Sequence, residues 1–141
     1  MRISEVSTPA AVIDLDILES NLRRNVDVCR ASQVSYRPHI KTHKIPALAH
    51  KQVQAGAHGI TCAKIGEAEV MARAGVKDIF IANCLVGWGK FERLVSLCGS
   101  CHLSTGVDSR ESAAALSEFF RPTTGRWMCC WKLIQGITAA A

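Results

Sequence analysis

The chain has 141 residues, 48% of them hydrophobic and 21% charged, which is enough for one globular domain with a buried core. No apolar run reaches the roughly 18 residues of a membrane span, and the first residues lack the apolar core of a signal peptide. The net charge is +5, but the basic residues are dispersed, which disfavours nucleic-acid binding. These features predict a cytoplasmic protein with no nucleic-acid or membrane partner.

The chain contains seven cysteines, a high count that without a secretion signal does not indicate a disulfide framework. Cys98, Cys101 and His102 match the Cys-x-x-Cys-His pattern of haem attachment and could also contribute to a metal site. Haem attachment would require export, and a zinc site would require a further ligand. A haem or metal module at this segment is therefore an alternative to the interpretation developed below.

Apolar periodicity divides the chain into alternating short strands and amphipathic helices. The predicted elements are a β-like run over 10–15, a helix over 17–31 capped by Asp16, a strand over 34–40, a helix over 46–55 opened by Pro46, a strand over 59–63, a helix over 66–74 closed by Gly75, a strand over 78–84, a helix over 89–97 closed by Gly99, a strand over 102–107, and a helix from Asp108-Ser109 to Phe120. This alternation predicts a parallel sheet with crossover helices, as an open doubly wound sheet or a closed barrel. The absence of Gly-x-Gly-x-x-Gly after the first strand disfavours a dinucleotide-binding sheet.

The most informative stretch, residues 37–44, reads Arg-Pro-His-Ile-Lys-Thr-His-Lys. Strand alternation places Arg37, His39 and Lys41 on one face, with Lys41 at the strand end. An amine in this position, flanked by histidines, suits a carbonyl cofactor such as pyridoxal phosphate, because the amine can form a Schiff base while its neighbours move protons. A solvated basic loop is the competing interpretation.

This motif is accompanied by matching stretches from Thr8-Pro9 to Asp16, at Gly59–Val70, at Ile79–Asn83 and at Val107–Ser109. Together they resemble the fold-type III pyridoxal-phosphate enzymes, the alanine-racemase-like barrels, and within them the D-threonine aldolase and D-serine dehydratase branch. The resemblance covers residues 6–120. It implies an α/β fold that forms the first four strand-helix units of a (β/α)8 barrel.

The resemblance also implies a function, a lyase of small D-amino acids that uses pyridoxal phosphate through a Schiff base at Lys41 rather than at Lys44. It implies a homodimer and, in metal-dependent members, a divalent metal whose ligands lie in a later β-rich domain. Because phosphate-binding loops also come later, we expect this chain alone to be inactive. Other fold-type III activities, such as an amino-acid racemase or a cofactor carrier, and a non-functional remnant are the alternatives.

The active site of a barrel lies at the carboxyl ends of its strands. On this basis Lys41 and His43 are predicted to be catalytic, and Lys41, His39, Thr61 and Asn83 to bind the cofactor, with no metal ligand in this chain. Either His39 or His43 could act as the base near Lys41, and the alternative for each is a histidine that only hydrogen-bonds the backbone.

Other polar side chains are predicted to be structural. Arg37 is interpreted as a strand-end salt bridge in preference to a charge partner for a cofactor or substrate anion. Glu67 and Glu69 are interpreted as acidic residues at a helix start that favour the helix dipole. The remaining histidines, predicted to be structural, are His50, His58 and His102.

Residues 121–141 form a separate, aberrant tail after the family-like domain over 1–120. The tail holds the cluster Trp127-Met128-Cys129-Cys130-Trp131. Trp and Met have one codon each and Cys codons begin with TG, so codons that start on the third base of the present ones must encode Asp-Val-Leu-Leu-Glu. That is a plausible apolar strand, and we infer a change of reading frame near Phe120–Arg121.

Overall fold

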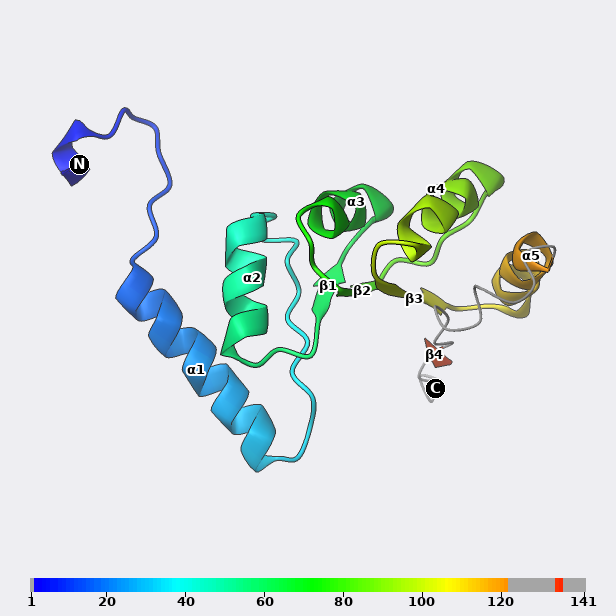
Figure 1. Ribbon diagram of the computed structural model, residues 1–141, viewed down its shortest axis with the longest axis horizontal. Coiled ribbons are helices and arrows are strands. Elements are labelled where there is room, and N and C mark those ends of the chain that lie inside the picture. The colour runs from blue at the N-terminus through cyan, green and yellow to red at the C-terminus, as the bar shows by residue number, and fades with distance from the viewer. Residues whose placement is uncertain (1, 122–133, 136–141) are drawn as a thin grey trace, which may run out of the picture.

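The computed structural model describes residues 2–121 and 134–135. A short 3-10 turn, η1 (Ile3–Glu5), and an extended segment precede the main body of the chain (Figure 1). The helices are α1 (Leu15–Ala31), α2 (Pro46–Ala55), α3 (Ile65–Arg73), α4 (Trp88–Cys98) and α5 (Arg110–Phe120), and the strands are β1 (Ile60–Cys62), β2 (Asp78–Ile81), β3 (His102–Val107) and β4 (Ile134–Gln135). The predicted alternation is confirmed from residue 46 to residue 120.

The four strands form one sheet in the order β1-β2-β3-β4, and every neighbouring pair is parallel. In Figure 1, α2, α3, α4 and α5 lie along one side of the sheet as an outer arc around the strands. A doubly wound sheet carries helices on both faces, whereas the wall of a (β/α)8 barrel carries them on the outside only. The helix placement therefore selects the barrel from the two predicted alternatives.

The segment over 36–40, expected as part of a strand over 34–40, runs parallel to β1 with a single bridge between His39 and Thr61. The Thr61 N–H donates to the Pro38 carbonyl at 2.8 Å, and the Ile40 N–H donates to the Thr61 carbonyl at 2.9 Å. Pro38 has no N–H to extend the ladder, which explains why the segment pairs without forming a regular strand. With α2, it is the first strand-helix unit, and β1 to α5 supply the next three.

The core lies between the sheet and the outer helices. Alternate strand residues face the helices and are at most 3% exposed, namely Ile60, Cys62, Ile79, Ile81 and Leu103. Helix residues including Met71, Phe91 and Leu94 cover them. Since successive strand side chains point to opposite faces, Thr61, Phe80 and Ser104 lie on the face that would line the barrel interior.

Two features of the N-terminal region differ from the sequence prediction. Helix α1 is capped by Asp14 instead of Asp16, because Asp14 Oδ1 accepts hydrogen bonds from the N–H groups of Asp16 and Ile17, each at 3.0 Å. The β-like run over 10–15 is not a strand: residues 10–14 are exposed and extended, and no described strand runs beside them to pair with.

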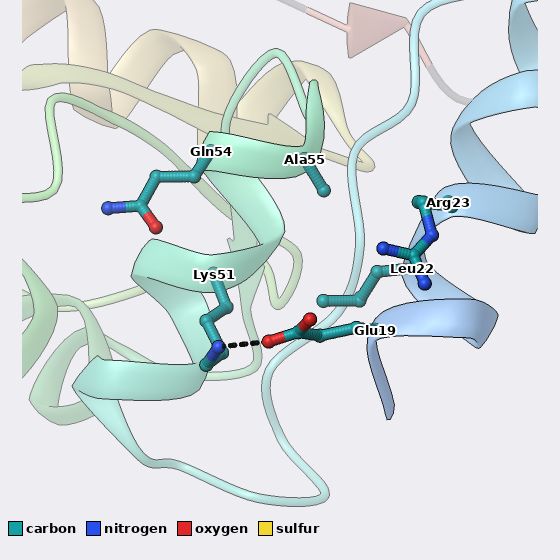
Figure 2. A pocket seen from close by; sticks show the side chains of 6 residues that line it. All are labelled: Glu19, Leu22, Arg23, Lys51, Gln54 and Ala55. Atoms are coloured by element: carbon teal, nitrogen blue, oxygen red, sulfur yellow. Dashed lines mark hydrogen bonds and ion pairs between the residues drawn. The ribbon is translucent and has the colours of Figure 1, made fainter. Parts of the chain in front are cut away.

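Helix α1 packs against α2 through Leu22 and Val26, its two buried residues. Figure 2 shows Lys51 of α2 facing Glu19 of α1, with Nζ and Oε1 2.6 Å apart. A groove of about 200 Å³ separates the two helices beside this ion pair, lined by Glu19, Leu22, Arg23, Lys51, Gln54 and Ala55. The groove lies between helices and contains none of the predicted site residues.

No helix within the described residues is both long and apolar enough to cross a membrane. The predicted aberrant tail falls mostly outside the described residues, including the cluster over 127–131 with Cys129 and Cys130. Of the tail, the structure describes Arg121, which follows α5, and the backbone of β4, in which Ile134 pairs with Gly106 and Gln135 with Val107.

Candidate functional site

The predicted site lies at the carboxyl edge of the parallel sheet. Lys41 directly follows the segment over 36–40, Ala63 follows β1, Asn83 lies just beyond β2, and Asp108 follows β3. Because parallel strands end at the same edge, these residues belong to one rim, where a barrel carries its active site. The side chains of Lys41 and Asn83 are exposed there.

The strand register places two of the predicted residues in one row. His39 pairs with Thr61, Thr61 with Phe80, and Phe80 with Ser104. These residues share the face opposite the helices, and Lys41 lies two residues after His39, in the turn that follows the segment. The structure thus pairs His39 with Thr61 and places Lys41 in the turn that follows, whereas Asn83 stands in the loop beyond this row, and the predicted roles of these residues stay predictions.

Ser104 is a member of this row that the sequence analysis missed. It is 6% exposed and carries the only side-chain hydroxyl besides Thr61 in the row over His39, Thr61, Phe80 and Ser104. Within a short apolar strand, periodicity alone gives no reason to select one serine. The available signal was register, because the serine falls opposite Phe80 when β2 and β3 are aligned at their first residues.

A tight turn after Ile40 presents Lys41. The Ile40 carbonyl accepts hydrogen bonds from the N–H groups of His43, at 3.2 Å, and Lys44, at 2.8 Å. The Lys41 N–H donates to His39 Nδ1 at 3.2 Å, which fixes the imidazole against the backbone of the predicted cofactor lysine. Among the described residues, the Lys41 amine itself has no ion-pair or hydrogen-bond partner.

The His43 ring contacts the start of α2. Its Nδ1 accepts the Ile45 N–H at 3.0 Å, so a neutral ring carries its proton on Nε2. Burial lowers the pKa of His43, and interactions with the Gln52 side chain and the Ile45 backbone offset only part of that effect. Within the described residues, His43 Nε2 and Gln52 Oε1 are buried without a hydrogen bond of good geometry. This arrangement supports a part in holding α2, while the predicted catalytic role of His43 stays a prediction.

Lys44, the rival amine, is held by a buried carboxylate. Its Nζ lies 3.3 Å from Glu67 Oε1, and Glu67 Oε2 accepts the Ala63 N–H at 2.8 Å. Glu67 belongs to the first turn of α3, as predicted, and is 8% exposed. Sequence reasoning missed its link to Lys44, which joins two strand-helix units and leaves no local pattern.

Arg37 lies at the opposite, amino edge of the sheet. Its Nη1 donates to Asp78 Oδ1 at 2.6 Å, which confirms the predicted strand-end salt bridge. Asp78 Oδ2 also faces His58 Nε2 at 3.5 Å and His102 Nδ1 at 3.4 Å. These two histidines therefore join strand beginnings and have the structural role that was predicted for them.

The cysteine segment shows no metal-binding arrangement. His102 faces Asp78, and the buried Cys101 thiol donates to the Leu97 carbonyl at 3.7 Å. In residues 2–121, no group of three or more His, Cys, Asp or Glu side chains is placed to hold a metal ion. The structure thus offers no support for the haem or metal module.

The residues at the rim include the chemical groups that a carbonyl cofactor would need. The Lys41 amine is exposed and has no partner among the described residues, and the half-buried His39 imidazole and the buried Thr61 hydroxyl lie in the neighbouring row. Carbonyl cofactors need a primary amine that can lose its proton and polar groups that orient the ring. Lys41, His39 and Thr61 meet these needs.

Comparison with known proteins shows which family this chain resembles in sequence and structure. Residues 13–132 match the family model described as "Alanine racemase, N-terminal domain". The chain is 37% identical over 116 residues to D-threonine aldolase of an Arthrobacter species and 39% identical over 116 residues to D-threo-3-hydroxyaspartate dehydratase of Delftia sp. HT23, covering 82% of this chain in both cases. The crystal structure of D-threonine aldolase from Filomicrobium marinum superposes with a TM-score of 0.89 at 36% identity, covering 98% of this chain and 36% of that one.

The chain spans about a third of the length of these relatives, 31% of the aldolase and 30% of the dehydratase. The matched part includes the strand-helix units described above, from the segment over 36–40 to α5. The family match covers most of the chain, and the structural superposition covers nearly all of it. The chain therefore belongs to the alanine racemase N-terminal domain family.

Proposed function

We propose that this chain is the lysine-bearing part of a pyridoxal-phosphate-dependent lyase of small D-amino acids. The observation that carries the proposal is the Lys41 amine, which has no partner among the described residues and stands at the carboxyl rim of a barrel wall, while Lys44 is tied to Glu67. The aldolase and dehydratase to which the chain is similar cleave or dehydrate substrates of this class by name.

The bound cofactor would supply an electron sink for the charge that develops at the substrate α-carbon. Lys41 would hold it covalently. His39, whose Nδ1 is occupied by the Lys41 N–H, would offer its Nε2–H as a hydrogen-bond donor, and Thr61 would offer its hydroxyl from the same face. Asn83 extends this set along the rim, and His43 remains the second candidate for moving protons.

The finer properties of the whole enzyme are also part of the proposal. They are a choice between aldol cleavage and dehydration, a homodimeric assembly, and a divalent metal bound outside this chain. Since the chain spans about a third of its relatives, we expect the isolated 141 residues to show no lyase turnover. Release of aldehyde or keto acid from D-threonine or D-serine by the purified chain would contradict that expectation.

The central test is covalent trapping of the cofactor on the protein. The 141-residue chain would be incubated with pyridoxal 5′-phosphate, reduced with borohydride and mapped by mass spectrometry. We expect the pyridoxyl group on Lys41, its loss in Lys41→Arg, and its retention in the matched variant Lys44→Arg. Attachment to another lysine, or equal loss in both variants, would rule out Lys41 as the cofactor residue.

A further inference from the structure

Two amines, Lys41 and Lys44, emerge from the same turn after Ile40, and only one can be the nucleophile toward a carbonyl. Lys41 is the first residue after the segment over 36–40, whereas Lys44 lies where the turn closes back on the Ile40 carbonyl. Both side chains are exposed, so exposure alone does not separate them. Their contacts do.

The contacts of Lys44 converge on one buried carboxylate. The Glu67 side chain is 7% exposed, compared with 56% for Lys44, and its two oxygens bind Lys44 Nζ and the Ala63 N–H. Burial alone would raise the pKa of Glu67, but the hydrogen bond from Ala63 and the charge of Lys44 outweigh it and leave the pKa below its ordinary value. Glu67 is therefore anionic at neutral pH.

Loss of the Lys44 proton would be costly in this setting. A cavity of about 240 Å³ beside the ion pair is walled by Val70 and Met71 as well as by Lys44, Lys64, Gly66 and Glu67. A neutral Lys44 would leave the Glu67 charge buried with only a backbone donor to compensate it, which is unfavourable where water is displaced by apolar groups. No such carboxylate faces Lys41 within residues 2–121.

The backbone also holds Lys44 in place. Its φ is +54°, a left-handed conformation that residues other than glycine adopt at a cost. The Lys44 N–H bond to Ile40 and the side-chain bond to Glu67 both oppose relaxation of this conformation. Through these two bonds, Glu67 connects the turn over 40–44 to Ala63, the residue that follows β1.

We propose that Glu67 is a positioning residue that decides which amine reacts: its buried carboxylate withholds Lys44 in an ion pair and leaves Lys41 as the nucleophile of the turn. The assignment rests on the proposed function in one respect, that the carbonyl met in the cell is the aldehyde of pyridoxal phosphate. The selection itself is a property of this chain and applies to any electrophile that reaches the rim.

Competitive acetylation tests the selection without any cofactor. With trace acetic anhydride, an amine nitrogen bonds to the acetyl carbon, acetate leaves, and the amine proton passes to the buffer. Tandem mass spectrometry then gives the rates at Lys41 and Lys44 separately. We expect Lys41 to react faster in the wild-type chain, and Glu67→Gln to raise the Lys44 rate relative to Lys41 by about threefold to fivefold, as suits a half-exposed ion pair.

Glu69→Gln is the matched control. Glu69 lies on the same helix and forms an ion pair with Arg93 at 2.6 Å. The variant loses this ion pair, which does not involve the turn over 40–44. It should leave the Lys44-to-Lys41 ratio unchanged. Glu67→Asp shortens the carboxylate and should behave like Glu67→Gln, which provides a second variant if Glu67→Gln fails to fold by circular dichroism. An equal ratio in wild type and a folded Glu67 variant would overturn the inference.

The trapping experiment with pyridoxal 5′-phosphate, repeated on the same variants, separates this inference from the proposed function. If the selection is correct, Glu67→Gln moves part of the pyridoxyl label from Lys41 to Lys44, and Glu69→Gln does not. Absence of label from the wild-type chain together with a changed acetylation ratio would refute the cofactor and leave the selection intact. Label confined to Lys41 in both folded Glu67 variants would refute the selection and leave the cofactor intact.

Discussion

At the scale of single residues, His43 links the turn over 40–44 to the stability of α2. The Ile45 N–H lies at the start of the helix, where backbone donors have no partner within the helix, and His43 Nδ1 supplies one. The same ring has a lowered pKa because it is partly buried. Folding and protonation of His43 are therefore coupled.

This coupling predicts a pH dependence with a defined sign. The folded pKa lies below the ordinary value of 6.5, so the unfolded chain binds the proton more readily and the stabilising contribution is lost as pH falls from 6.5 through the folded pKa. We expect His43→Asn, which keeps an acceptor but does not titrate, to lose this part of the dependence. Urea unfolding of both proteins at pH 8 and pH 5 measures it, and parallel profiles would contradict it.

Gly59 is a second residue whose role is set by packing. A Cβ atom there would lie 2.5 Å from Arg37 Nη1 and 2.6 Å from the Asp78 carbonyl oxygen. Gly59→Ala should therefore destabilise the fold by about 1–3 kcal/mol through overpacking. Gly89→Ala in α4, where nothing lies within 4 Å, should instead stabilise the helix by about 0.5–1 kcal/mol. Thermal unfolding of the two variants would be expected to shift in opposite directions, and a shared direction would refute the packing argument.

At the scale of elements, the contact between α1 and α2 allows the contribution of a buried apolar side chain to stability to be compared with that of an ion pair. Leu22 is 6% exposed and packs between the helices, while Glu19 and Lys51 meet at the edge of the groove in Figure 2. Leu22→Ala should cost about 2–4 kcal/mol, because it removes buried apolar surface and leaves a cavity. Lys51→Gln should have little effect, since solvent screens the exposed pair. Comparable losses of the unfolding free energy in the two variants would show that the ion pair holds α1.

The elements were predictable where one residue type or one period determines them. Pro46 opens α2, Gly75 follows α3 and Ser109 caps α5, as expected from the sequence. The segment over 36–40 was placed correctly but not its sparse pairing, which depends on Pro38. The strand expected over 10–15 was wrong, because apolar alternation indicates a strand only where a neighbouring strand can pair with it.

The candidate site was predictable to a similar extent. Alternation within one segment was enough to place Lys41 and His39 on a common face, and barrel topology was enough to bring Thr61 near them. The Lys44–Glu67 pair and the position of Ser104 depend on how separate strand-helix units align. Such contacts are tertiary, so local periodicity carries no information about them.

At the scale of the whole molecule, the described sheet is one wall of a barrel, with β4 continuing the parallel order beyond β3. The inferred change of reading frame predicts what should follow that wall. DNA sequencing from codon 118 onward should reveal, in the frame that encodes Asp-Val-Leu-Leu-Glu, an open reading frame that continues with further strand-helix units. Stop codons soon after this stretch in that frame would refute the inference.

The alternation of side chains over 36–40 also governs which changes of length the chain tolerates. Pro38 and Ile40 are buried, whereas His39 is half-buried and Lys41 is exposed. A single inserted or deleted residue here would exchange the two faces of the segment. The Lys41 amine would then be directed toward the hydrophobic core, and Ile40 would be exposed to water. An insertion in the loop at Gly87 should be harmless by comparison. The proposed cofactor attachment at Lys41 thus depends on the number of residues in this segment as well as on their identity.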